Sequence, residues 1–388
     1  MNQSGFAKLI PVIFSGILFF TGCSRDSGSA VLTSVPETIR LDECAIIHEP
    51  EFGGIYIRKT IEEFNDLGFE FGDSVTLEFS NGYSLESLPY YNGFYTKTGE
   101  PLLVGYPGYD YIKAAISNGG DLWDIADLSD NDTAVITLEE KGKYRDIQNA
   151  RDLHYTDERD DYENDAVFAN FRSVKCTGIN EGILYRSASP CDNQHGRAPY
   201  VDKLIKENGV GYILDLADDN DKIDGYIKSD DFDSPYFKEL NDKGFVIPLS
   251  MNMDYTSDRF REGLKKGFIA IAENEGPFLV HCTEGKDRTG YFCMLLEALC
   301  GATYDEIVDD YMTTYHNYYH LDEKTDKEKY KIIIRDVLDP MIANTIGNGN
   351  SDIMTEDLSS CAERYFLDIG LDADTISRVR NKLERSGR

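Results

Sequence analysis

Ten consecutive residues, His281 to Gly290, carry the residue types of a phosphate-binding nucleophilic site. A short apolar run at 277–280 precedes them and predicts a buried strand, and an apolar run at 291–299 predicts a core helix. A loop between a strand and a helix directs backbone N–H groups, including those of the first helical turn, into one small volume. The sequence therefore predicts a nest for an anion, with phosphate as its natural ligand.

Cys282 stands at the start of this loop, where a thiol has a physical reason to be a nucleophile. The helix N-terminus and the guanidinium of Arg288 both favour thiolate over thiol, so we expect reactivity near neutrality. Arg288 can also bind two phosphate oxygens in a planar fork that lysine could not reproduce. Gly285 and Gly290 allow the backbone to curl tightly around the ligand. An inert buried cysteine is the alternative interpretation, but it does not account for the arginine and the glycines.

Two other kinds of strand–loop–helix site fit less well. A rhodanese-like sulfur carrier also places a cysteine on such a loop, but Arg288-Thr289 argues against it. A Walker phosphate loop needs Ser or Thr after Gly-Lys, whereas Asp287 follows Lys286 here.

The string Cys-x5-Arg-Thr at 282–289 resembles the signature loop of protein tyrosine phosphatases. Its Gly-Lys-Asp-Arg-Thr-Gly version is similar to the atypical bacterial branch, known as tyrosine, dual-specificity and phosphoinositide phosphatases. Asn170-Phe171-Arg172 and Leu184-Tyr185-Arg186-Ser187 resemble the opening segments of that branch. There are two departures: Ser173 stands where the branch often has Asp, and Ala217-Asp218 replaces the Arg that often closes the Asp-Leu strand. The resemblance covers about 166–320.

The resemblance implies hydrolysis through a phosphocysteine, with no metal and no cofactor. In that mechanism Cys282 attacks phosphorus, and the loop binds the equatorial oxygens. Thr289 can hydrogen-bond the departing thiolate, and His281 can hold the loop. The residues expected to bind phosphate are Thr283, Glu284, Gly285, Lys286, Asp287 and Arg288.

Such a reaction also needs an acid to protonate the leaving oxygen. Asp254 lies 28 residues before Cys282, between an expected strand at 245–249 and an expected helix at 258–273, where tyrosine phosphatases in general carry a mobile acid loop. Asp287, inside the nest, is the alternative, because it is the acid proposed in some bacterial relatives. We expect Asp254 to be the acid; an exposed loop carboxylate is the simpler interpretation of the same residue.

Three hypotheses for the substrate follow from the loop. The first is a phosphorylated protein, as for a phosphotyrosine or dual-specificity phosphatase. The second is an inositol polyphosphate or phosphoinositide, which the second positive charge of Lys286 would favour. The third, of another class, is a binding protein that holds a phosphate ligand without turnover.

The charge of the chain limits its partners. It has 39 basic and 70 acidic residues among 388, which gives a formal net charge of −31. A field of this sign repels nucleic acid and anionic lipid headgroups at long range, so we expect no nucleic-acid partner. Phosphate capture must then be local, in the nest.

The amino-terminal segment resembles a bacterial lipoprotein signal. Leu9 to Phe20 is an apolar core of twelve residues, too short to span a bilayer, and Phe20-Thr21-Gly22-Cys23 resembles a lipobox. We expect 1–22 to be removed, Cys23 to carry the lipid anchor and 23–30 to be a tether. The protein would then lie outside the cytoplasmic membrane and be attached to it; plain secretion and an uncleaved membrane anchor are the alternatives.

The rest of the sequence divides into two regions with different hydrophobic patterns. Residues 31–150 contain alternating runs at 75–79, 101–104 and 134–138 between turn signals, which predicts a small, mostly β, barrel-like domain. An acidic linker follows at 151–165. Residues 166–388 alternate short apolar runs with helical patterns, which predicts an α/β domain with a central, mainly parallel sheet flanked by helices. In such sheets ligands bind at the carboxyl ends of the strands, where Cys282 is placed.

Metal sites are not indicated. Six cysteines besides Cys23 and Cys282 allow fifteen disulfide connectivities, and no Cys-x2-Cys pair is present. His316 and His320 have metal-ligand spacing on a helix, but without a third ligand nearby we expect them to be surface or interface residues.

Overall fold

The computed structural model describes residues 38–50, 53–97, 99–117, 119–346, 353–354 and 356–384. The expected signal segment, Cys23 and the tether lie outside the described residues. Within those ranges, every helix is too short or too polar to cross a lipid bilayer.

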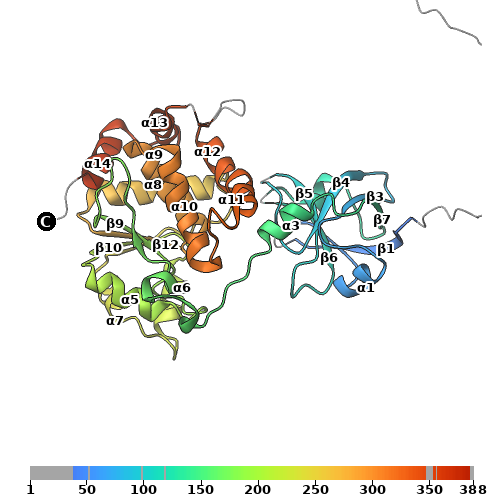
Figure 1. Ribbon diagram of the computed structural model, residues 1–388, viewed down its shortest axis with the longest axis horizontal. Coiled ribbons are helices and arrows are strands. Elements are labelled where there is room, and N and C mark those ends of the chain that lie inside the picture. Colours follow the sequence, from blue (N-terminus) through green and yellow to red (C-terminus); the bar gives the residue numbers. More distant parts are fainter. Residues whose placement is uncertain are drawn as a thin grey trace, which may run out of the picture. The chain divides into compact units, whose positions relative to one another are not determined.

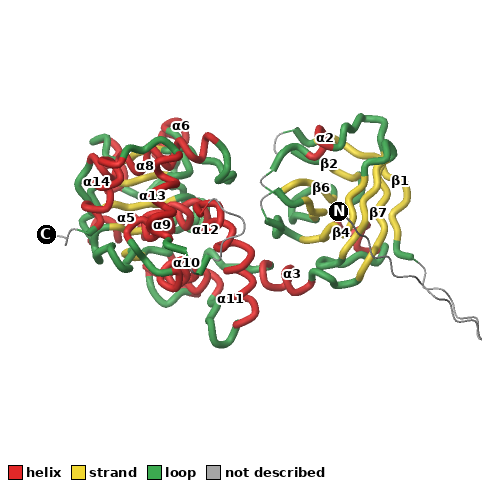
Figure 2. The backbone as a smooth tube through the Cα atoms, turned by 90° about the horizontal axis from the view of Figure 1, so that it is seen from above, coloured by secondary structure: helices red, strands yellow, loops and turns green. Residues whose placement is uncertain are grey.

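The first strands of the chain close into a barrel, seen as the yellow strands beside α3 in Figure 2. Their order is β1-β2-β6-β5-β4-β3-β7, with β7 pairing back onto β1. All pairs are antiparallel except β4 with β5. The elements are β1 (Arg40–His48), β2 (Ile55–Ile57), α1 (Ile61–Asp66), β3 (Ser74–Phe79), β4 (Ser84–Tyr91), β5 (Pro101–Val104), β6 (Ile112–Ile116), α2 (Leu122–Ile125), β7 (Thr133–Glu140) and α3 (Arg145–Arg151).

The barrel encloses its own apolar core, in which Phe64, Phe69 and Tyr90 are fully buried. The barrel-like sheet expected from the alternating runs is therefore present, and three of those runs coincide with β3, β5 and β7. Most aromatic residues here serve packing, since Phe64 stacks on Phe69 with ring centroids 4.1 Å apart. Trp123, the only tryptophan in the chain, is also buried in this core.

Glu139 ties together three barrel strands. Its carboxylate accepts hydrogen bonds from the Ser74 hydroxyl on β3 (2.9 Å) and from the backbone N–H of Ser87 on β4 (2.9 Å). Partial burial alone would raise the pKa of Glu139, but bonds from Thr76, Ser87 and Ser74 outweigh burial and lower that pKa to about 2. Ionised Glu139 therefore stabilises the barrel.

We expect Glu139→Gln to lower the free energy of unfolding at pH 7 by about 1 kcal/mol, a value kept small because the side chain is exposed to solvent screening. The stabilisation by ionised Glu139 is complete above its pKa in the unfolded chain, near 4.5, and is lost as the pH falls toward 2. The difference in unfolding free energy between variant and parent should therefore shrink below pH 4.5. Urea unfolding followed by Trp123 fluorescence measures it. Glu140→Gln, which removes the neighbouring charge, is the control; an equal loss there would contradict the assignment.

A second sheet of five strands follows, in the order β11-β10-β12-β9-β8. Strands β11, β10, β12 and β9 are mutually parallel, and the two-residue β8 is antiparallel at the edge. Their bounds are β8 (Arg172–Ser173), β9 (Leu184–Ser187), β10 (Tyr212–Asp215), β11 (Val246–Pro248) and β12 (Phe278–His281). The carboxyl ends of the parallel strands lie at one edge, at Ser187, Asp215, Pro248 and His281.

Both faces of this sheet are buried, as is usual for parallel strands, and successive side chains along each strand point to opposite faces. On β12, Phe278 and Val280 pack into the larger core, whereas Leu279 packs into a second core on the opposite face. Helices α5, α6 and α7 cover the second core, and α8, α9, α10, α13 and α14 cover the larger one (Figure 1). The chain thus forms a mixed α/β fold with a barrel at its amino-terminal side.

The helices after the barrel lie where the sequence pattern predicts them, but some begin or end at other residues than predicted. Helix α8 has the expected bounds, α9 begins four residues earlier than expected, at Asp287, and α10 runs from Tyr304 to Tyr319. The helices are α4 (Asp165–Phe168), α5 (Ala198–Glu207), α6 (Asn220–Ile227), α7 (Pro235–Asp242), α8 (Asp258–Glu273), α9 (Asp287–Cys300), α10 (Tyr304–Tyr319), α11 (Lys327–Ile333), α12 (Asp339–Ile346), α13 (Leu358–Asp368) and α14 (Ala373–Leu383), with a 3-10 turn at Arg159–Asp161 and a π-helical turn at Ile334–Leu338.

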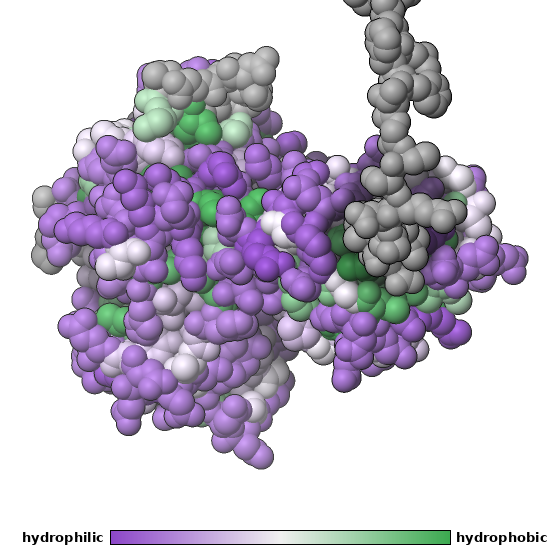
Figure 3. Space-filling view, turned by 45° about the vertical axis from the view of Figure 1, so that its right-hand side comes forward, coloured by the Kyte–Doolittle hydropathy of each residue, from purple (hydrophilic) through white to green (hydrophobic). Residues whose placement is uncertain are grey.

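Hydrophilic residues cover most of the face shown in Figure 3, and hydrophobic residues form small separate areas on it. This agrees with a chain that has 28% charged residues. The domain boundaries expected from the sequence remain a prediction.

Candidate functional site

The ten-residue segment connects β12 to α9 at the carboxyl edge of the sheet. Cys282 follows directly after β12 and is buried, with 3% of its surface exposed. Helix α9 begins at Asp287 without a side-chain cap, and its first backbone bond runs from the Gly290 N–H to the Lys286 carbonyl (2.8 Å). The N–H groups of the first turn are therefore unpaired within the described residues, as an anion-binding helix terminus requires.

Gly285 is required by the path of this loop. Its φ is +68°, and a Cβ placed on it would lie 2.1 Å from the Ser187 carbonyl oxygen. Any larger residue would push the loop away from the end of β9, since both the backbone conformation and the space exclude a side chain.

Arg288 is oriented by two contacts across the mouth of the loop. Its two terminal nitrogens donate to the Met251 carbonyl (3.1 Å), just beyond β11, and to the Thr283 hydroxyl (3.3 Å). The Nε atom is buried without a hydrogen-bond partner among the described residues. The guanidinium is thus held over the loop by weak contacts that an anion can replace.

The back of the loop is held by a buried ionic network. Asp310, on α10, accepts hydrogen bonds from Arg172 (Nε, 2.8 Å) and from Arg186, whose side chain is 1% exposed. Arg186 in turn donates to the Gly285 carbonyl (2.9 Å). Burial alone would raise the pKa of Asp310, but the two guanidinium groups hold that pKa well below its usual range. The loop is therefore fixed by a charge-assisted chain of contacts.

Two neutral side chains complete this support. Asn170, fully buried, donates to the carbonyls of Glu284 and Gly285, both at 3.3 Å. The Tyr318 hydroxyl donates to the Glu284 carbonyl at 2.7 Å. Because the loop carbonyls are bonded from behind, its N–H groups are left to face the opposite side.

His281 is neutral in this setting. It is completely buried, and its Nδ1 lies 3.3 Å from the Cys282 carbonyl. Burial lowers the pKa of His281 to about 4. A neutral ring whose Nδ1–H donates to that carbonyl contacts the first peptide of the loop.

Glu284, Lys286 and Asp287 form a charged group beside the loop. Lys286 lies 3.1 Å from a Glu284 oxygen and 3.8 Å from an Asp287 oxygen, and it donates to the Tyr319 hydroxyl (3.2 Å). The Glu284 side chain also accepts a bond from Tyr155. Glu284 can therefore offer an anion only its backbone N–H, since its side chain is turned toward its own partners.

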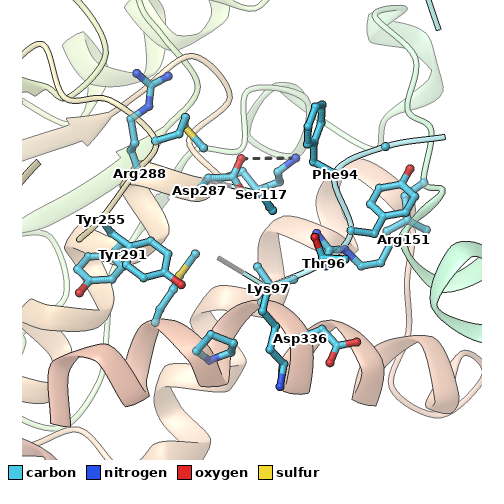
Figure 4. Close-up of a pocket in the computed structure, with 18 of the residues that line it drawn as sticks. Phe94, Thr96, Lys97, Ser117, Arg151, Tyr255, Asp287, Arg288, Tyr291 and Asp336 are labelled. Atoms are coloured by element: carbon cyan, nitrogen blue, oxygen red, sulfur yellow. Dashed lines mark ion pairs between the residues drawn. The ribbon is translucent and has the colours of Figure 1, made fainter. Parts of the chain in front are cut away.

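A cavity of about 650 Å³ opens beside Arg288 and Asp287. Figure 4 shows Asp287 paired with a lysine amino group, near Arg288 on one side and Phe94 on the other. The lining is rich in aromatic residues and includes four cationic side chains. These are Phe94, Tyr95, Tyr106, Tyr255, Phe260, Tyr291, Tyr315 and Tyr319, with Lys97, Arg151, Lys286 and Arg288.

Asp254 lies on the loop between β11 and α8, and its neighbours Met253 and Tyr255 line this cavity. One oxygen of Asp254 accepts from the N–H (2.9 Å) and the hydroxyl (2.6 Å) of Thr256. Asp287, in contrast, lines the cavity itself. The structure thus places both candidate acids at or beside one opening.

Several residues of the site could not be identified from the loop. The expected residues 281–290 are brought together, and the resemblance segments supply Asn170, Arg172 and Arg186 as their support. Asp310 and Tyr318 lie on α10, the helix on which only His316 and His320 were considered from the sequence. An acidic residue within the apolar face of a predicted helix was the one signal that could have identified Asp310.

His316 and His320, which have metal-ligand spacing in the sequence, lie at the end of α10. All seven cysteines in the described part of the chain are free. His316 Nδ1 pairs with the Leu321 carbonyl (3.2 Å), and His320 ends α10 in a left-handed conformation.

Comparison with known proteins places this arrangement in a family. The model of the tyrosine phosphatase family matches residues 143–385, more than half of the chain. The protein therefore belongs to the tyrosine phosphatase family.

Two individual similarities are more limited. Over 54 residues the chain is 43% identical to a protein of Cupriavidus necator named as a candidate tyrosine-protein phosphatase, which covers 14% of this chain and about a fifth (19%) of that protein. A crystal structure of an uncharacterized conserved protein from Thermotoga maritima aligns with a TM-score of 0.23 and 19% identity, over 26% of this chain and 37% of that one.

We expect Asp310→Asn to lower the free energy of unfolding by about 3–5 kcal/mol, because it leaves Arg172 and Arg186 buried with an uncompensated charge. Urea unfolding gives this value, and equilibrium binding of inorganic phosphate should weaken as the Gly285 carbonyl loses its anchor. Asp309→Asn, on the exposed side of the same helix turn, should change neither quantity. Equal effects in the two variants would contradict the network's role.

Proposed function

We propose that this protein is a phosphatase that hydrolyses phosphomonoesters through a phosphocysteine intermediate, with phosphotyrosine protein as its substrate. One observation carries the proposal: Cys282 and Arg288 stand on one loop, and the helix that follows begins without a side-chain cap, so its first N–H groups are free to bind an anion. Membership of the tyrosine phosphatase family supports it.

The chemistry follows from these positions. The Cys282 thiolate attacks phosphorus, the ester P–O bond breaks, and a carboxylic acid gives its proton to the leaving oxygen. Arg288 and the loop N–H groups bind the equatorial oxygens throughout. Water then attacks phosphorus, the S–P bond breaks, and the carboxylate accepts the water proton. Thr289, whose buried hydroxyl has no other partner in the described part of the chain, is suited to stabilise the departing thiolate.

The lining of the cavity supports an aromatic phosphoester. Tyr255 and Tyr291 are stacked on one another, with ring centroids 5.2 Å apart, beside Arg288. Aromatic walls bury and orient a phenyl ring through stacked and edge contacts. A phosphotyrosine side chain fits such a lining better than a small aliphatic phosphate.

An inositol polyphosphate or phosphoinositide is the second candidate, and the cations of the cavity favour it. Lys97 and Arg151 line the opening in addition to Lys286 and Arg288. However, Lys286 is already paired with Glu284 and Asp287, so less positive charge is free for a second phosphate than the count indicates.

We also retain the proposal that the protein is an exported lipoprotein, anchored through Cys23 outside the cytoplasmic membrane. Its support is the lipobox-like sequence 20–23. Mass determination of the amino terminus after expression in a bacterial host tests it.

Cys282→Ser should reduce kcat by about 10³-fold or more while phosphate binding persists, because the hydroxyl is a far weaker nucleophile and the nest is unchanged. The assay compares a phosphotyrosine peptide, inositol hexakisphosphate and a phosphoinositide. Cys44→Ser, the same exchange in the barrel, is the control. If the parent binds phosphate and hydrolyses none of the three, the non-catalytic alternative replaces the proposal.

Asp254→Asn should lower kcat on phosphotyrosine by about 10²–10⁴-fold, and much less on an aryl phosphate with an activated leaving group. Asp258→Asn, at the start of α8, is the control. Finding this pattern in Asp287→Asn and not in Asp254→Asn would assign the acid to Asp287.

A further inference from the structure

A buried cluster of possible metal ligands lies behind the loop, and the proposed mechanism does not use it. It consists of Cys191, Asp215 and Asp218, which we call the acid cluster. One ligand atom from each lies within 4.8 Å of the others, and all three residues are buried (0–4% exposed). Asp215 ends β10, Asp218 precedes α6, and Cys191 follows β9, so they meet at the same carboxyl edge as Cys282.

Two fully buried polar atoms next to one another have no hydrogen-bond partner among the described residues. Asp215 Oδ2 and His281 Nε2 are both unpaired, and they lie 3.8 Å apart. The other Asp215 oxygen accepts from the N–H groups of Ala217 and Asp218, each at 3.0 Å. Asp215 is therefore fixed in place with one free oxygen directed toward the His281 ring.

In the tautomer that His281 adopts, neither its Nε2 atom nor the Asp215 oxygen has a hydrogen to donate to the other. Because Nδ1 faces the Cys282 carbonyl, Nδ1 carries the ring proton, and Nε2 presents a lone pair toward the Asp215 oxygen. Two acceptors that face one another in the interior are costly unless a proton or a cation lies between them.

No cationic side chain of the described residues is bonded to either of these two atoms. Lys222 lies 3.7 Å from Asp218 on the outer side, with 61% of its side chain exposed, and Arg288, which also acts on Asp215, donates to the Met251 carbonyl and the Thr283 hydroxyl. Cys191 contacts the Ser189 hydroxyl at 3.4 Å. The cluster thus has a sulfur and two carboxylates inside, and its Asp218 end borders solvent through Lys222.

We propose that the acid cluster binds a divalent cation of the zinc class, with His281 Nε2 as the fourth ligand. Thiolate, imidazole and carboxylate together suit Zn²⁺ rather than Ca²⁺ or Mg²⁺, which take oxygen ligands. Bond lengths of about 2.0–2.3 Å place tetrahedral ligands roughly 3.5 Å apart. The atoms of the acid cluster, which lie within 4.8 Å of one another, and the Asp215 Oδ2 and His281 Nε2 atoms, 3.8 Å apart, would move closer on binding. The cation would hold the ring that supports the first peptide of the loop.

Cobalt(II) is the probe, because a thiolate ligand gives a charge-transfer band and tetrahedral geometry gives intense visible bands. The purified chain, freed of metal, should bind one Co²⁺ with both signals. Cys191→Ser should lose the charge-transfer band, whereas Cys282→Ser and Cys361→Ser, each removing another buried thiol, should retain it. Zn²⁺ should displace Co²⁺ and raise the melting temperature of the parent and of Cys282→Ser.

Asp218→Asn provides an independent test if Cys191→Ser fails to fold, since its side chain lies at the edge of the cluster. It should weaken Co²⁺ binding by more than about tenfold, as loss of a ligand requires. Absence of the band in the parent would overturn the proposal. So would a band lost in Cys282→Ser and kept in Cys191→Ser, because the cation would then sit on the nucleophile. Unchanged affinity in Asp218→Asn would also overturn it. Each measurement is independent of catalytic activity.

Discussion

The geometry of the candidate site depends on the buried contact of Asp310 with Arg172 and Arg186. Removing such charges from water costs several kcal/mol for each ion, so the network is a poor source of stability by itself. The network instead fixes the position of the loop, because Arg186 donates a hydrogen bond directly to the Gly285 carbonyl. Nearby Glu297 is fully buried, and burial followed by the Asp310 charge raises its pKa well above the usual value. With Glu297 neutral, two arginines and one aspartate leave a net positive charge behind the loop, which favours an anion in front of it.

The loop itself could be predicted because its information is local. Residues 281–290 are contiguous, and the strand before them and the helix after them follow from simple apolar runs. The bounds of α8 were equally accessible, since a Ser257 cap precedes an amphipathic pattern. The early start of α9 could not be predicted. The side chains of Asp287 and Arg288 indicated a phosphate-binding loop, whereas their backbone is already helical.

Other features depended on contacts that the sequence does not display. Asp310 and Tyr318 lie on a helix whose pattern resembles any amphipathic helix, and only the fold brings them against the loop. In the barrel, β1 and β4 escaped prediction because β1 carries charged residues at alternate and adjacent positions and β4 contains Pro89. Strand β1 pairs with the distant β7, with irregular register at Leu41/Cys44, and β4 pairs with the preceding β3, with irregular register at Val75/Leu77.

The hydrogen bonds to the carbonyl groups of the loop also determine at which stage of folding the loop can form. Asn170 and Glu284 are 114 residues apart, Arg186 and Gly285 are 99 apart, and Glu284 and Tyr318 are 34 apart. Contacts of such sequence separation form late, because loop-closure entropy must be overcome before they contribute. During synthesis the cysteine therefore emerges well before Tyr318, and its loop has no complete support until α10 has left the ribosome. Cys282 therefore lacks its complete environment through that interval.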